Sequence, residues 1–227
     1  MRLRAALVAL IAIAGCAHAQ PVGEMDRSGF VDAGHAMPGL VVDMRYASTM
    51  NFVGRPIAGY DAPVCLLTRE TVVALAKVQA LLREFGLGLK VFDCYRPKRA
   101  VADFVVWAKD LDDQKRKAEQ YPNVDKTKLF ELGYIAERSG HSRGSTLDLT
   151  LVDARTGAEL DMGSGYDLFD TLSWPSDPRP GAEARAHRML LQAVMTTNGF
   201  RPLKEEWWHF TLKDEPYPDT YFDFVVP

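Results

Sequence analysis

The feature that most constrains this chain is a run in which leucine alternates with polar residues across 146–151. A period of two predicts a β-strand, with the three leucines on a face that packs in the core. The opposite face then carries Asp148 in the middle of the strand. A buried carboxylate costs free energy unless it has a partner. We therefore expect Asp148 to point toward a partner group on the far side of the sheet.

His141 is the first candidate partner of Asp148. It lies seven residues earlier, an odd number, so a single regular strand would put the two side chains on opposite faces. The segment Arg143-Gly144-Ser145 can bend the chain and return both side chains to one cleft. An imidazole and a carboxylate are two of the three protein ligands that a catalytic zinc site needs. The best candidate for the third is His209, in the segment Glu-Glu-Trp-Trp-His-Phe at 205–210.

Two further residues fit the chemistry of a zinc peptidase. Glu206 lies three residues before His209, and a bend ahead of the strand would let its carboxylate act as the general base. Arg96 lies where a predicted strand meets a predicted helix. It would stabilise the oxyanion of the tetrahedral intermediate that forms during peptide hydrolysis. Spacing alone also allows a plainer interpretation. In that interpretation His141 is a hydrogen-bonded loop histidine, His209 a core histidine among tryptophans, and Arg96 part of a surface salt bridge.

The N-terminus reads as a secretory signal peptide. Two arginines within the first four residues are followed by a short apolar run and then by small residues ending in Ala17-His18-Ala19. Cleavage after Ala19 would leave a mature chain of residues 20–227. The sequence Ile-Ala-Gly-Cys at 13–16 also resembles a bacterial lipobox, which would instead anchor the protein by a lipid on Cys16. We expect an exported protein of the periplasm or cell envelope, with residues 1–19 outside the fold.

Composition excludes several classes of function. The formal net charge is −3, so no basic field indicates nucleic-acid binding. Hydrophobic residues make up 47% of the chain and charged residues 25%, as in an ordinary globular domain, and no transmembrane span is expected in the mature chain. Cys65 and Cys94 are the two cysteines beyond Cys16. In an exported protein they can form a disulfide, or both can remain free and buried, and the sequence leaves both open.

Periodicity predicts a single α+β domain with a central antiparallel sheet and helices packed on one side. Helices are expected from Thr68 to Phe85, from Pro97 to about Ala108 and from Ala182 to Asn198, with a shorter one near 126–132 in a polar insertion. Strands are expected at 40–46, 87–94, 146–152, around 207–212 and, as an edge strand, at 221–226. The apolar stripes are Val72, Leu75, Val78, Leu82 and Phe85 in the first helix, and Met189, Leu190, Ala193 and Val194 in the last.

Three segments carry a resemblance to a known family. The segment 139–151 (Ser-Gly-His-Ser-Arg-Gly-Ser-Thr-Leu-Asp-Leu-Thr-Leu) is similar to the zinc motif of the VanX-type D-alanyl-D-alanine dipeptidases. The segments 93–97 (Asp-Cys-Tyr-Arg-Pro) and 206–210 (Glu-Trp-Trp-His-Phe) also resemble that family, in the same order. The family is related to the D,D-carboxypeptidases, the lysostaphin-type peptidases and the hedgehog domain. The likeness extends over nearly the whole mature chain, and it implies a hedgehog/D,D-peptidase-like fold.

The resemblance implies a role for eight residues. One zinc ion per chain would be bound by His141, Asp148 and His209, with Glu206 as base and Arg96 as oxyanion stabiliser. The small dipeptide pocket would be lined by Tyr46, Ser139 and Asp167, with the carboxylate of Asp167 suited to a free substrate ammonium. Two positions depart from the family pattern. Gly140 stands where a serine is often found, and Thr146 where alanine is usual. Neither change removes a ligand, but Gly140 removes a hydrogen-bonding group for the substrate carboxylate.

The resemblance predicts zinc-dependent hydrolysis of D-alanyl-D-alanine to two D-alanines in the bacterial envelope. Two alternatives remain at this stage. One is a D,D- or L,D-carboxypeptidase that trims muropeptides. The other is a non-catalytic zinc or peptidoglycan-binding module. Glu206 favours an enzyme, because a binding module needs no base beside the ligand His209. The sequence does not indicate the oligomeric state, the stereospecificity or the longest peptide accepted.

Overall fold

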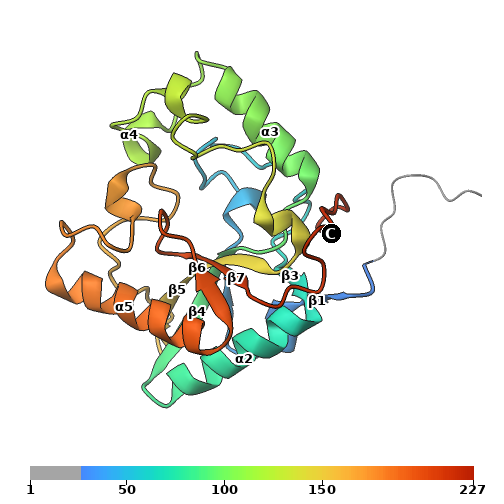
Figure 1. Ribbon diagram of the computed structural model, residues 1–227, viewed down its shortest axis with the longest axis vertical. Coiled ribbons are helices and arrows are strands. Elements are labelled where there is room, and N and C mark those ends of the chain that lie inside the picture. Colours follow the sequence, from blue (N-terminus) through green and yellow to red (C-terminus); the bar gives the residue numbers. More distant parts are fainter. Residues whose placement is uncertain (1–26) are drawn as a thin grey trace, which may run out of the picture.

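The computed structural model describes residues 27–227, so the expected signal peptide and the alternative lipid anchor at Cys16 lie outside the described residues. The core is a five-stranded sheet in the order β2-β4-β5-β7-β6 (Figure 1). Its strands are β2 (Val41–Val42), β4 (Leu87–Asp93), β5 (Thr146–Asp153), β6 (Phe200–Pro202) and β7 (His209–Leu212). All neighbouring pairs are antiparallel except β2 and β4, which run parallel.

Helices cover the sheet in two separate layers. Helices α2 (Arg69–Arg83) and α5 (Ala182–Thr197) lie together below the sheet in Figure 1, while α3 (Lys98–Lys109) and the short α4 (Lys117–Gln120) lie above it. The α+β prediction is confirmed, and α2 and α5 are the helices packed on one face. The remaining short elements are β1 (Phe30–Asp32), α1 (Ala33–Ala36), β3 (Leu66–Thr68) and four 3-10 turns, η1 (Arg45–Ala47), η2 (Lys126–Lys128), η3 (Gly140–Arg143) and η4 (Thr171–Ser173).

Strand β5 is buried on both faces. Its leucines, Leu147, Leu149 and Leu151, are fully inaccessible to solvent, as the alternation predicts. The polar face is almost as deeply buried, with Asp148 only 2% exposed. The layer above the sheet therefore covers the polar face. Polar groups buried on that face cost free energy unless they have partners inside the protein.

The long helices begin and end close to the predicted residues, but their buried faces differ in part. Helix α2 ends before Gly86, whose φ of +71° suits a residue without Cβ. Phe85 was expected in the apolar stripe and is 72% exposed, because it follows the last helical turn. In α5 the predicted stripe is right at Val194, which is buried, and wrong at its other three residues. Met189 is 69% exposed, while Leu191 and Met195 are buried.

Three predicted elements differ from the structure. The strand expected at 40–46 is reduced to the two residues of β2, followed by the turn η1. The helix expected near 126–132 is the single turn η2, and α4 was not predicted. The C-terminal edge strand at 221–226 is absent from the described chain apart from one bridge between Tyr60 and Val226. The tail instead crosses loops, and the Phe222 N–H donates to the Ser142 carbonyl at 2.8 Å.

Cys65 and Cys94 form a disulfide, with their Cα atoms 5.3 Å apart. The prediction of a bridge is therefore confirmed over the alternative of two free buried thiols. The bond joins the residue before β3 to the residue after β4, 29 positions apart. A loop of that length corresponds to about 3–4 kcal/mol of stabilisation in the chain-entropy model.

Candidate metal centre and active site

Three side chains from three different segments converge above strand β5. Asp148 points from the polar face of β5, and the antiparallel register places His209, the first residue of β7, directly opposite it. His141 lies in the 3-10 turn η3, which ends at Gly144 in the left-handed conformation, φ +81°. The bend predicted at 143–145 therefore exists, and it returns His141 to the face of the sheet that carries Asp148.

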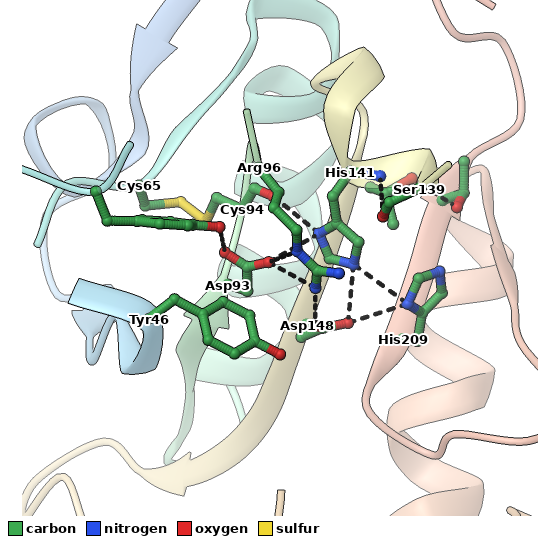
Figure 2. A network of polar contacts seen from close by, with 12 residues as sticks. Tyr46, Cys65, Asp93, Cys94, Arg96, Ser139, His141, Asp148 and His209 are labelled. Carbon is green, nitrogen blue, oxygen red and sulfur yellow. Dashed lines mark hydrogen bonds and ion pairs between the residues drawn. A yellow bond between two sulfur atoms is a disulfide. The ribbon is translucent and has the colours of Figure 1, made fainter. Parts of the chain in front are cut away.

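The potential ligand atoms of these residues lie within 4.8 Å of one another. Asp148 Oδ1 is 3.1 Å from His209 Nδ1 and 3.4 Å from His141 Nε2, and the two ring nitrogens are 3.3 Å apart (Figure 2). Asp148 Oδ1 is buried and accepts no hydrogen bond from any residue in the described range 27–227. Two imidazoles and a carboxylate oxygen that lacks a hydrogen bond are a donor set that fits a divalent cation such as zinc.

The backbone carbonyl of Cys94 fixes the tautomer of His141. His141 Nδ1 lies 2.8 Å from that carbonyl oxygen. A carbonyl can only accept, so Nδ1 carries the proton and donates. The lone pair of a neutral ring is therefore on Nε2, the nitrogen that faces Asp148 and His209. A histidine ligand held by a hydrogen bond on its other nitrogen is the usual arrangement at protein metal sites.

Arg96 lies beside the three converging side chains, with its own side chain 13% exposed. Its guanidinium donates to Asp93 Oδ2 from Nε at 2.9 Å, and Nη2 lies 3.8 Å from Asp148 Oδ2. The guanidinium also lies over the ring of Tyr46, 5.0 Å from its centroid. The plainer prediction of a surface salt bridge is therefore wrong, because Arg96 has a buried partner and faces the site.

Sequence reasoning missed two supporting residues, Asp93 and Tyr60. Asp93 is fully buried, and the Tyr60 hydroxyl donates to its Oδ1 at 2.7 Å while Arg96 bonds Oδ2. The available signal was a carboxylate at the end of an apolar strand, three residues before an arginine. The rings of Tyr60 and Tyr46 lie next to each other, with their centroids 5.8 Å apart. Both are buried, because the layer above the sheet covers them.

The electrostatics of the site favour a cation. Burial raises the pKa of the Asp93 carboxyl, and the charge of Arg96 opposes that rise. Burial would also raise the pKa of Asp148, but the adjacent imidazoles of His141 and His209 outweigh it and hold that pKa below its usual range. For His209, burial lowers the pKa, yet the adjacent carboxylates of Asp148 and Glu206 raise it to about 9. The carboxylates around His209 therefore stabilise positive charge between them.

The converging groups open onto a cavity of about 270 Å³. Every residue named from the resemblance contributes to its wall: Tyr46, Arg96, Ser139, His141, Asp148, Asp167, Glu206 and His209. Glu206 reaches the cavity because the chain turns before β7, and its Oε2 lies 3.4 Å from His209 Nδ1. A volume of this size suits a small ligand.

Asp167 and Tyr46 form a polar pair in the cavity wall. The Tyr46 hydroxyl donates to Asp167 Oδ2 at 2.9 Å. Burial and the nearby charge of Asp148 raise the pKa of the Asp167 carboxyl well above its usual range. Asp167 has a φ of +59°, uncommon for a residue with a side chain. This backbone conformation orients the buried carboxylate toward Tyr46 and the cavity.

Ser139 and Gly140 form the start of the turn that carries His141. The Ser139 Oγ accepts a hydrogen bond from the His141 N–H at 3.3 Å, which caps η3. Gly140 lies against Thr146, and a Cβ on residue 140 would come within 3.0 Å of the Thr146 Oγ1. The Thr146 hydroxyl in turn lies 2.9 Å from the Thr211 hydroxyl. The two departures from the family pattern are therefore neighbours in space.

Comparison with known proteins identifies the family. A family model described as D-ala-D-ala dipeptidase matches residues 26–227. The D-alanyl-D-alanine dipeptidase of Streptomyces coelicolor is 45% identical over 87% of this chain and 96% of its own length. The chain belongs to the D-Ala-D-Ala dipeptidase family. The D-alanyl-D-alanine dipeptidase of Enterococcus faecalis is 40% identical over 88% of this chain and 98% of its own length. That of Escherichia coli is 35% identical over 89% of this chain and 96% of its own length.

Membership of the D-Ala-D-Ala dipeptidase family makes the chain an enzyme, as Glu206 indicated. Among solved structures, a vancomycin resistance D,D-pentapeptidase in complex with Zn(II) is 13% identical, with a TM-score of 0.39 over 66% of this chain and 74% of its own. A likeness that low bears on neither fold nor chemistry. Within residues 27–227, no helix is both long and apolar enough to cross a membrane.

Proposed function

We propose that this enzyme hydrolyses D-alanyl-D-alanine to two D-alanines with one zinc ion per chain. The observation that carries the proposal is the convergence of His141, Asp148 and His209, whose potential ligand atoms lie within 4.8 Å of one another beside Glu206. The choice of substrate is supported by relatives named D-alanyl-D-alanine dipeptidases, which are up to 45% identical to this chain over nearly their full length. A zinc ion held there would supply Lewis acidity and bring the pKa of a water molecule down to about 7.

Two residues would assist peptide hydrolysis, one by transferring a proton and one by stabilising negative charge. Glu206 would take the proton of the attacking water and pass it to the leaving amine, as a general base and then acid. Its carboxylate is 27% exposed, so it can exchange protons with the cavity. Arg96 is held in place by Asp93 and carries a fixed positive charge beside Asp148. It would stabilise the negative charge that develops on the carbonyl oxygen.

The cavity wall supplies groups for both ends of a dipeptide. Asp167 would pair with the substrate ammonium, and Tyr46 holds that carboxylate in position through its hydroxyl. Ser139 lines the cavity at the start of the turn that carries His141, so it would lie beside a bound dipeptide. Gly140 offers no side chain for the substrate carboxylate. We therefore propose that substrate affinity depends mainly on the ammonium end.

One experiment tests the metal and the substrate together. Purified protein is loaded with zinc and offered D-Ala-D-Ala, L-Ala-L-Ala and a pentapeptide ending in D-Ala-D-Ala. We expect cleavage of D-Ala-D-Ala in preference to the other two, and we expect His141→Ala to lose most of its bound zinc. Preferred cleavage of the pentapeptide would assign a carboxypeptidase instead. Near-stoichiometric zinc in His141→Ala would overturn the ligand assignment.

A further inference from the structure

We propose that the Cys65–Cys94 disulfide is a positioning device for the metal ligand His141. It would act through the Cys94 carbonyl, which accepts the Nδ1 proton of His141 and so aims Nε2 at the site. Figure 2 shows the disulfide, this carbonyl and His141 in one continuous chain of contacts. The inference rests on the proposed function, because it concerns a residue that would bind zinc.

Cys94 lies just past the regular part of the sheet. Pairing of β4 with β5 is irregular between Val91 and Asp93, and the last paired residue is Asp93, opposite Asp148. Cys94 follows that last pair, so the ladder between β4 and β5 does not extend to its carbonyl. The disulfide attaches Cys94 to Cys65 instead, and a hydrogen bond of 2.9 Å from the Tyr95 N–H to the Leu66 carbonyl adds a second attachment.

The other end of the disulfide is also anchored next to the metal-ligand turn. The Cys65 carbonyl accepts from the Ala33 N–H at 2.9 Å, and Cys65 leads directly into β3. At the end of β3, the Thr68 N–H donates to the Gly144 carbonyl at 2.8 Å. The segment 65–68 therefore contacts the Cys94 side through a covalent bond and the His141 turn through its backbone. Together with a hydrogen bond of 3.3 Å from the Arg96 N–H to the His141 carbonyl, these contacts hold the Cys94 carbonyl near the His141 ring.

A competing acceptor shows what loss of the disulfide would change. Asp93 Oδ2 lies 3.3 Å from His141 Nδ1, farther than the Cys94 carbonyl, and it already accepts from Arg96. If the Cys94 carbonyl moves away, the His141 ring can turn toward Asp93. Its Nε2 then no longer points at Asp148 and His209. Loss of an outer partner of a metal-binding histidine typically costs about 10–100-fold in metal affinity. We expect a loss in that range when the disulfide is removed.

The test compares zinc affinity with and without the disulfide. Cys65→Ala/Cys94→Ala removes the bond, and Cys65→Val/Cys94→Ala removes it while restoring apolar volume at a buried position. Zinc affinity is measured by chelator competition on variants whose fold is confirmed by circular dichroism. The nitrogen-15 shifts of the His141 ring are recorded on the metal-free protein. We expect zinc to bind about 10–100-fold more weakly in both variants. The Nδ1–H tautomer should be kept, but the His141 Nδ1 shift should change, because the proton is then donated to Asp93 and no longer to the Cys94 carbonyl.

A matched control separates positioning from general stability. Leu191→Ala removes a fully buried side chain from α5, on the other side of the sheet, and should lower stability while leaving zinc affinity within twofold. Folded disulfide variants with zinc affinity within twofold of the wild type would overturn this inference alone. Failure of both variants to fold would also count against it, because the disulfide would then serve folding. A wild-type protein that binds no zinc would contradict the proposed function.

Discussion

Glu205 and Glu206 are adjacent carboxylates with different surroundings, which makes one a control for the other. Glu206 lines the cavity and approaches His209, whereas Glu205 pairs with Lys204 at 3.2 Å outside it. Glu206→Gln keeps the size of the side chain and removes the basic oxygen. We expect kcat on D-Ala-D-Ala to fall by about 10²–10⁴-fold. KM should change much less, because the proton transfer to Glu206 occurs in the transition state and does not contribute to substrate binding.

The control for this prediction is Glu205→Gln, which should remain near wild type, as surface changes usually do. Zinc content is measured in the same samples. It should stay close to that of the wild type, since the three expected ligands are untouched. An active Glu206→Gln, or an equal loss in Glu205→Gln, would show that the base has been misassigned.

Gly140 and Thr146 are expected to be energetically coupled. A side chain at 140 would press on the Thr146 hydroxyl, at 3.0 Å from the new Cβ. We expect Gly140→Ser to lower the free energy of unfolding by about 1–2 kcal/mol, since overpacking costs about that much. The loss should be smaller in the Thr146→Ala background. Urea unfolding of the four proteins in the double-mutant cycle measures the coupling, and energies additive within about 0.3 kcal/mol would show independence.

At the scale of elements, the C-terminal tail supports the turn that carries His141. Arg143 follows His141 in this segment, and its Nε and Nη2 donate to the two carboxylate oxygens of Glu215, both at 2.8 Å. Arg201 reaches the same carboxylate at 3.1 Å, but its side chain is 56% exposed against 15% for Arg143. One carboxylate therefore has a nearly buried partner and an exposed one.

The difference in burial predicts different costs. Arg143→Met should lower the free energy of unfolding by about 1–3 kcal/mol, because it leaves the Glu215 carboxylate, 4% exposed, without its main partner. Arg201→Met should cost under about 1 kcal/mol, as exposed ion pairs usually do. Urea unfolding at pH 7 measures both. An equal loss of stability in Arg143→Met and Arg201→Met would mean that the bidentate pair between Arg143 and Glu215 does not stabilise the turn.

The bounds of helices and strands were predictable where neighbouring residues in the sequence determine them. The glycines after α2 and α5 and the alternation in β5 mark boundaries within the sequence itself. The buried face of α5 was not predictable in this way. Met189, Leu190 and Leu191 are consecutive apolar residues, and the packing of α5 against the sheet selects Leu191. The 221–226 segment has strand-like alternation, but its backbone bonds to loops, which local pattern does not reveal.

At the scale of the whole molecule, the sheet separates a stabilising face from a functional one. Helices α2 and α5 cover the face of the leucines, and the layer above the sheet closes the face of Asp148 (Figure 1). The ligand set was predictable because its residues lie in short motifs. The supporting contacts of Asp93, Tyr60 and the Cys94 carbonyl join residues up to 47 positions apart, and only the tertiary fold defines them.

The disulfide also bears on where the molecule acts. Disulfides form and persist in oxidising compartments, which agrees with the signal peptide expected at 1–19. We expect the protein to be exported and its mature form to begin at Gln20, after cleavage following Ala19. Intact mass and N-terminal sequencing of the mature protein measure this. Cys16→Ala should leave the cleavage site and release unchanged, because Cys16 would lie in the discarded segment. A fatty acyl group on Cys16, with loss of processing in Cys16→Ala, would instead establish a lipid-anchored enzyme held at the membrane surface.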